Sequence, residues 1–167
     1  MRMLLAILSS LGAAGAMAAE TLVVPADVHE LIQARGCSQV SDFYTRPAIE
    51  RPPYALTSLD HGRVLVAVWC IRPSAVRGSQ QTYTLLTQID QPAHPLAVCP
   101  KQIDGIQWIG GLAFVDVNGD TAGYYFVDTQ KPVGTRSLRT KGIESSYDGL
   151  TTFYICVDGR WAAKSLD

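Results

Sequence analysis

Pairs of residues that favour tight turns recur along most of this chain, and they constrain its fold more than any other feature. In each pair glycine follows Asp, Asn or His, and Asn-Gly and Asp-Gly tolerate the positive φ angles that two-residue β-hairpin loops require. Alternating or continuous apolar segments lie between them, as expected of strands. The pairs are His61-Gly62, Asp104-Gly105, Asn118-Gly119, Asp148-Gly149 and Asp158-Gly159.

The segments between these turns predict an antiparallel β protein. Residues 63–71 are almost all apolar, which indicates a central strand covered on both faces. Strands at this spacing predict a mainly β fold, either an antiparallel β-sandwich or a small barrel. The other expected strands are residues 81–90, 111–117, 120–128, 136–146, 150–157 and 160–164.

One short helix is expected before the strands, at residues 25–36. Asp27 can accept a hydrogen bond at its N-terminus, with Glu30 as the partner in a capping box. Gly36 would end the helix. The apolar stripe that would pack on the rest of the protein is Val28, Leu31 and Ile32.

Residues 1–18 have the features of a secretory signal peptide. Arg2 supplies a positive charge, an apolar stretch follows, and Ala16-Met17-Ala18 is a cleavage site with small residues. The apolar stretch is shorter than the roughly 18 to 20 residues that a membrane span needs. We therefore expect a cleaved signal peptide at residues 1–18 and a single β-rich domain at residues 19–167. This predicts a periplasmic or secreted protein that does not span a membrane.

The charge of the chain argues against a nucleic-acid partner. The formal net charge is −1, and loss of Arg2 with the signal peptide would make it −2. Proteins that bind nucleic acid usually carry a basic stripe or patch. No block of like charge is present in the sequence.

Four cysteines lie in the part that would be exported. An even number in an exported chain predicts disulfides. Four cysteines allow three pairings, and we favour Cys37 with Cys70 and Cys99 with Cys156 because it joins neighbours along the chain. There is no C-x-x-C motif, which argues against a zinc site or a thiol nucleophile.

Asp116, Asn118 and Asp120 place oxygen-bearing side chains at alternate positions. This segment resembles the start of the calcium loops of EF-hands and of integrin-like propeller repeats, which implies calcium ligation by these three residues. The resemblance ends at Thr121, where both patterns have glycine. We favour a hairpin without metal, in which Asn118-Gly119 joins residues 112–117 to residues 120–127. A calcium site remains the alternative, and no other cofactor is expected.

The sequence contains no recognisable catalytic motif. The three histidines, His29, His61 and His94, are not at zinc-ligand spacing, and no serine lies in a G-x-S-x-G motif. Most acidic residues lie in turns, where aspartate bonds its own backbone. Glu50 and Glu144 do not, but nothing in the sequence pairs them.

These observations favour an exported bacterial binding protein without catalysis. We expect an inhibitor or immunity-type protein whose partner is an envelope protein or effector enzyme. The contact surface would lie on loops at residues 102–111 and 131–142. One alternative is an envelope hydrolase with a carboxylate or histidine site that the sequence does not place. Another is a calcium-stabilised envelope or adhesion module. The expected contact residues are Trp108, Arg136 and Arg139.

Overall fold

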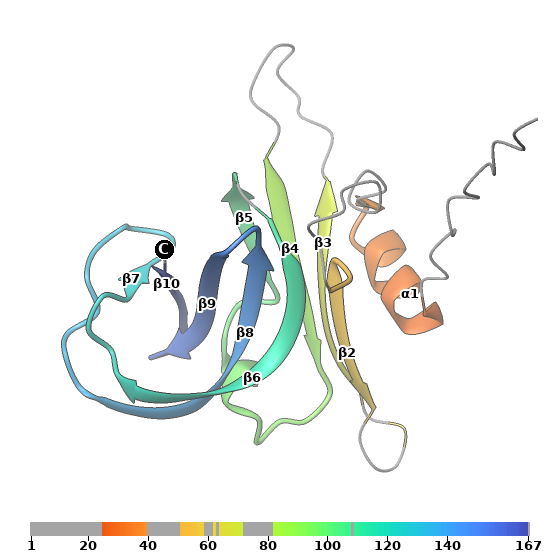
Figure 1. Cartoon of the computed structure of the whole chain (residues 1–167). Coiled ribbons are helices and arrows are strands. Elements are labelled where there is room, and N and C mark those ends of the chain that lie inside the picture. The colour runs from red at the N-terminus through yellow and green to blue at the C-terminus, as the bar shows by residue number, and fades with distance from the viewer. Residues whose placement is uncertain are drawn as a thin grey trace, which may run out of the picture.

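Two antiparallel sheets pack face to face, and one helix covers the outer face of the first sheet (Figure 1). The computed structural model describes residues 25–39, 51–58, 62, 64–71, 82–107 and 109–166. The mainly β fold is confirmed, and because the sheets do not close into a barrel, the sandwich alternative is correct. The expected signal peptide, His61 and Trp108 lie outside the described residues.

The first sheet is built around β3. On one side β3 pairs with β4, which pairs with β5; on the other side β1 and β2 pair with different parts of β3. Residues 65–70 of β3 are all buried, as the apolar sequence predicted, because each face of the strand meets a different layer. The strands of this sheet are β1 (Ser38–Gln39), β2 (Tyr54–Ser58), β3 (Val64–Ile71), β4 (Tyr83–Ile89) and β5 (Gln102–Ile106).

The second sheet has the order β6-β8-β9-β10-β7. Asp148-Gly149 and Asp158-Gly159 join its central strands, and all four residues have positive φ, as the hairpin prediction requires. β6 and β8 are long and curved (Figure 1). The strands are β6 (Gly111–Asp120), β7 (Tyr125–Phe126), β8 (Ser137–Tyr147), β9 (Leu150–Val157) and β10 (Arg160–Leu166).

Three hydrophobic clusters hold these layers together. The central cluster lies between the sheets and includes Trp69, Leu85, Ile143 and Trp161. A second cluster lies between the helix and the outer face of the first sheet. A third lies where the segment around β7 covers the outer face of the second sheet, with Tyr124 and other residues packed on Ile155, Val157 and Ala162. The sandwich therefore buries both faces of its central strands.

The helix α1 (Ala26–Ala34) buries Val28, Leu31 and Ile32, as predicted. The predicted cap is wrong: Pro25 holds the N-cap position, and no side chain caps the helix there. Asp27 lies in the first turn, where a negative charge still favours the helix dipole. The helix ends at Ala34, with Arg35 as its C-cap, and Gly36 follows in the left-handed conformation with φ of +63°.

The predicted hairpin at Asn118-Gly119 is wrong. β6 continues through both residues, which pair with Arg139 and Leu138 of β8. The chain turns only after Thr121, whose hydroxyl donates to the Gly134 carbonyl at 2.6 Å and accepts from the Arg136 amide at 2.9 Å. Pairing with the long strand β8 and the hydrogen bonds of the buried Thr121 outweigh the local preference of Asn-Gly for a turn.

Three related predictions also fail. Within the expected strand at residues 120–128, Asp120 is the last residue of β6, and only the two residues of β7 form a further strand. Residues 102–106 form β5 and not a loop, and Gly105, with φ of +77°, lies at a register shift between β4 and β5. Asp104-Gly105 thus forms a β-bulge, because Thr84 of β4 donates to the Asp104 carboxylate at 2.7 Å and keeps the strands paired. Similarly, much of the expected loop at residues 131–142 belongs to β8.

Residues 51–53 join the two sheets. The Pro53 carbonyl accepts from the Trp69 amide of β3 at 2.9 Å, and the Pro52 carbonyl accepts from the Leu112 amide of β6 at 2.9 Å. Arg51 adds an ion pair with Glu144 of β8 at 2.7 Å. Prolines have no amide hydrogen but keep their carbonyl acceptors, so this segment links both sheet edges without pairing as a strand.

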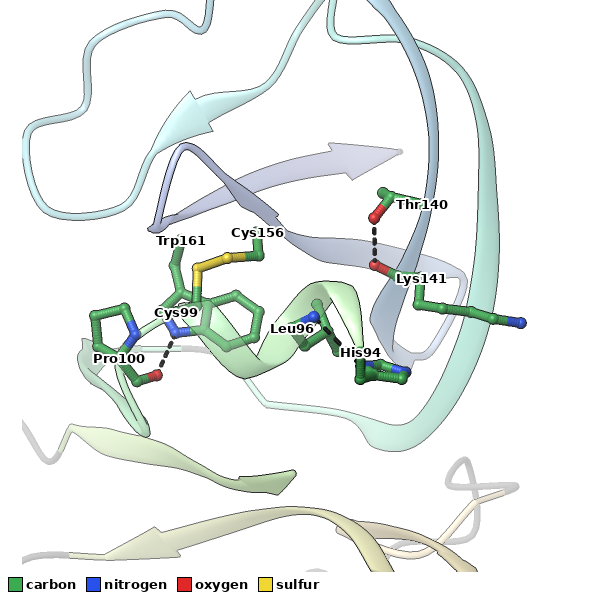
Figure 2. Close-up of a disulfide and its surroundings, with 8 residues drawn as sticks. All are labelled: His94, Leu96, Cys99, Pro100, Thr140, Lys141, Cys156 and Trp161. Carbon is green, nitrogen blue, oxygen red and sulfur yellow. Dashed lines mark hydrogen bonds between the residues drawn. A yellow bond between two sulfur atoms is a disulfide. The ribbon is translucent and has the colours of Figure 1, made fainter. Parts of the chain in front are cut away.

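Two disulfides brace the fold. Cys37, just after α1, joins Cys70 of β3, and Cys99 joins Cys156 of β9 (Figure 2). This is the pairing that the sequence favoured. Cys99 follows the short 3₁₀ helix η3 (Pro95–Val98), which packs against β8 and β9. Two disulfides fit an oxidising compartment.

Within the described residues, no helix has the length and apolar character needed to cross a lipid bilayer.

Candidate functional site

The strands β6 and β8 continue beyond the buried interior, and there their inner faces become charged. Phe114 of β6 packs against the central cluster, and Asp116 lies two residues further along the same face, since side chains alternate along a strand. On β8 the buried Ile143 is followed on the same face by Lys141 and then Arg139. The register places Lys141 opposite Asp116.

The helix η3 adds His94 to this surface. His94 is only 8% exposed, and its Nδ1 accepts a hydrogen bond from the Leu96 amide at 3.3 Å (Figure 2). The ring proton is therefore on Nε2 in the neutral form. Burial, and to a lesser degree the charge of Lys141, hold the pKa of His94 below its usual value. His94 is thus neutral at physiological pH.

Together these side chains line a cleft of about 370 Å³, here named the charged cleft: His94, Asp116, Arg139 and Lys141. The Lys141 ammonium lies 2.6 Å from an oxygen of the Asp116 carboxylate, and both side chains are largely exposed. Arg139 makes no ion pair with any of the residues that the structure describes. Its guanidinium is free to bind a carboxylate or phosphate from outside.

The structure separates the two arginines that the sequence put on one contact surface. Arg136 precedes β8 and pairs with Asp158 of the β9–β10 turn at 2.9 Å. Arg139 lies in the charged cleft. Trp108, the third predicted contact residue, is outside the described residues.

Asp116, Asn118 and Asp120 lie along a single extended strand and not in a loop. Residues two apart on a strand share a face but are separated by about 6.8 Å at their Cα atoms, so these three side chains lie in a row, whereas the ligands of a calcium loop converge on one ion. Asp116 is bound to Lys141, and Asp120 accepts from the Ala122 amide at 2.9 Å. Among the described residues, no group of three or more acidic, histidine or cysteine side chains is arranged to hold a metal ion.

Of the groups that the sequence considered for catalysis, Glu50 lies outside the described residues, as His61 does, while His29 and Glu144 bond other side chains. On α1, a nitrogen of His29 bonds the Gln33 amide at 2.7 Å. Glu144 accepts from Arg51 and from Ser146, both at 2.7 Å, beside a second cleft near the β8–β9 turn. These bonds fasten β8 to the segment before β2, and they give Glu144 a structural role.

The sequence did not predict that His94 and Lys141 lie beside each other in one cleft. One local signal was present, since Pro95 directly after His94 favours a helical start with His94 as its cap. The contact with Lys141 joins residues that are far apart in the sequence, and only the packing of η3 on β8 creates it.

No protein-family model, no curated protein and no solved structure matches this chain. Fold and site define a disulfide-braced β-sandwich with a charged cleft at the end of its two longest strands.

Proposed function

We propose that this chain is an exported bacterial binding protein that recognises an acidic segment of a protein partner through its charged cleft. The single observation that carries this proposal is Arg139, an exposed guanidinium without an ion pair among the described residues. A free arginine beside a second cation offers the bidentate geometry that carboxylates bind.

The rest of the cleft supports recognition and not chemistry. Lys141 adds a second positive charge, and Asp116 holds its ammonium in place. The His94 ring can donate from Nε2 to an acceptor that enters the cleft. The disulfides and the proline link keep these elements rigid, which lowers the entropic cost of binding.

An inhibitor or immunity-type protein of the periplasm or the extracellular space would fit these features. Such a protein needs a rigid scaffold and a few charged residues that match its target. The two disulfides support an oxidising compartment. The partner proposed is an enzyme of the envelope with an acidic surface segment.

The test is affinity capture from envelope extract with immobilised protein. The wild-type protein should retain one stoichiometric partner, and rising salt should release it because screening weakens exposed charge pairs. Arg139→Glu should abolish the capture. Lys131→Glu makes the same charge change on an exposed lysine outside the cleft and should retain it. Absence of a stoichiometric partner, or equal capture by the Arg139 variant, would refute the proposal.

A further inference from the structure

A third cleft, separate from the charged cleft and from the one beside Glu144, lies between the end of β5 and the segment that carries β7. Its volume is about 670 Å³, and it opens over the inner face of β9 and β10. None of the described residues that line it is charged. It shares no lining residue with the charged cleft. We name it the neutral cleft, and its polar groups come from Gln107, Tyr125, Gln130, Thr152, Tyr154 and Ser165.

Tyr154 is the feature that points to a ligand. Its side chain is 4% exposed, and its ring packs edge-on against Trp69 with the centroids 6.1 Å apart. Its hydroxyl makes no hydrogen bond to any residue that the structure describes. Burial raises the pKa of Tyr154, so the hydroxyl stays protonated and remains a donor. Buried polar groups are rarely left unsatisfied, and each exception needs an explanation.

The other polar groups of the neutral cleft still have capacity for hydrogen bonds. The hydroxyls of Thr152 and Ser165 share one bond at 3.0 Å. The Gln130 amide nitrogen donates to the Val127 carbonyl at 2.9 Å, which leaves its oxygen as an acceptor. Tyr125 is 48% exposed and presents an apolar ring at the rim.

The wall that carries Tyr125 and Gln130 is held in place. Arg160 of β10 donates two hydrogen bonds to the Asp128 carboxylate, at 2.6 and 3.2 Å, and lies over the Phe126 ring. Gln130 adopts a positive φ of +55°, unusual for a residue with a side chain. This anchoring pre-organises the cleft and reduces the entropy lost when a ligand binds.

We propose that the neutral cleft binds an uncharged sugar unit. Sugar hydroxyls both donate and accept, which matches the amides and hydroxyls of the described lining residues, none of which is charged. The apolar face of a pyranose ring can stack on an exposed tyrosine ring. Small-molecule sites are usually concave and combine apolar and aromatic side chains with a few convergent polar groups. Here Ile106, Val127, Ala163 and the tyrosine rings supply the apolar part of the lining. This proposal is independent of the charged cleft and its protein partner.

The experiment is an NMR titration of the full-length oxidised protein with neutral sugars at millimolar concentrations. The probes are glucose, maltose, N-acetylglucosamine and diacetylchitobiose, with sorbitol as a non-cyclic control and glucuronate as a charged one. We expect saturable shifts of the amide signals of Gly123, Tyr125 and Gln130 with at least one sugar. The signals of His94 and Arg139 should not move.

Tyr154→Phe removes the hydroxyl and keeps the ring. We expect it to weaken sugar binding about three- to tenfold, the effect of one hydrogen bond. Its melting temperature should be equal to or above that of the wild type, because an unsatisfied buried hydroxyl is lost. Tyr125→Ala should weaken binding about tenfold through loss of stacking area. Tyr124→Phe alters a buried tyrosine outside the cleft and should bind normally.

The probes also separate two sources of the sugar. Tighter binding of the disaccharides would indicate a chain of an envelope polymer, and equal binding of the monosaccharides would indicate a free sugar. The proposal is overturned if no sugar produces saturable shifts in the cleft, if sorbitol produces the same shifts, or if Tyr154→Phe and Tyr125→Ala bind as the wild type does.

Discussion

At the residue scale, the environment of a side chain decides its role more than its type does. His94 and His29 are both histidines with one hydrogen bond. His94 is buried beside Lys141, whereas His29 is exposed on α1. Burial and a nearby cation disfavour the charged form of His94, so its pKa is lowered. The stability of the protein should therefore depend on pH through His94.

The first prediction concerns the pH dependence of stability. Because the folded pKa of His94 lies below its unfolded value of about 6.5, the unfolded chain binds more protons between these two values. The contribution of neutral His94 to the free energy of unfolding is complete above a pH of about 6.5, the unfolded pKa. It is lost as the pH falls from this value through the lower folded pKa. His94→Asn keeps a capping acceptor but cannot titrate, so its unfolding free energy should fall less between pH 7.5 and 5.5.

Urea denaturation at several pH values would measure this effect. Identical pH dependence in wild type and His94→Asn would show that His94 does not titrate in this window.

The second prediction concerns calcium. Asp116 and Asp120 are each bonded within the protein and lie along a strand. A ligand that binds only the folded state raises its stability. We expect the melting temperature of the oxidised protein to be the same with millimolar calcium and with chelator. A rise of several degrees with calcium would instead favour the alternative of a calcium-stabilised module.

At the element scale, strand pairing overrides local turn preference. Asn118-Gly119 favours a hairpin by itself, but both residues stay in β6 because β8 extends alongside them to Ser137. The close packing of β8 against β6 and β9 depends on Gly142. A Cβ added there would lie 2.8 Å from a methyl carbon of Val117 and 3.0 Å from the Tyr154 carbonyl oxygen. Position 142 therefore has no room for a side chain, which explains the glycine in the middle of the sheet.

The third prediction compares two glycines in the same part of the chain. Gly142→Ala should destabilise the protein by about 1 to 3 kcal/mol, the usual cost of overpacking. An added Cβ at Gly134 would meet no atom within 4 Å, so Gly134→Ala should be close to neutral. Chemical denaturation of both variants measures the difference. Equal stability of the two variants would contradict the close contact at Gly142.

At the scale of the whole molecule, stability depends on links between layers. The central cluster joins the sheets, residues 51–53 bond both of them, and each disulfide ties a helix to a strand. The bond between Cys99 and Cys156 spans 57 residues and fixes η3, which carries His94, against β9. Its loss would affect both the fold and the charged cleft.

The fourth prediction therefore concerns this disulfide. Replacing Cys99 and Cys156 together by Ala should lower the unfolding free energy by about 4 kcal/mol, as loop entropy predicts for a closure of this length. Thermal and urea unfolding of the oxidised variant would measure it. The same double change at Cys37 and Cys70 should cost slightly less, because 33 residues separate them. An unchanged stability would mean that the entropy of the unfolded chain contributes little here.

The sequence by itself determined the features that depend on local chemistry. Apolar periodicity located the helix and most strands, and Asp148-Gly149 and Asp158-Gly159 specified their hairpins, because these signals act over a few neighbouring residues. The tertiary structure decided the features that depend on distant partners. The hydrogen bonds of Thr121 place the turn after Asn118-Gly119. Pairing with β4 accommodates Gly105 in a β-bulge, and packing of η3 on β8 places His94 beside Lys141. The charged cleft and the neutral cleft belong to this second group, because their walls come from strands and loops that only folding brings together.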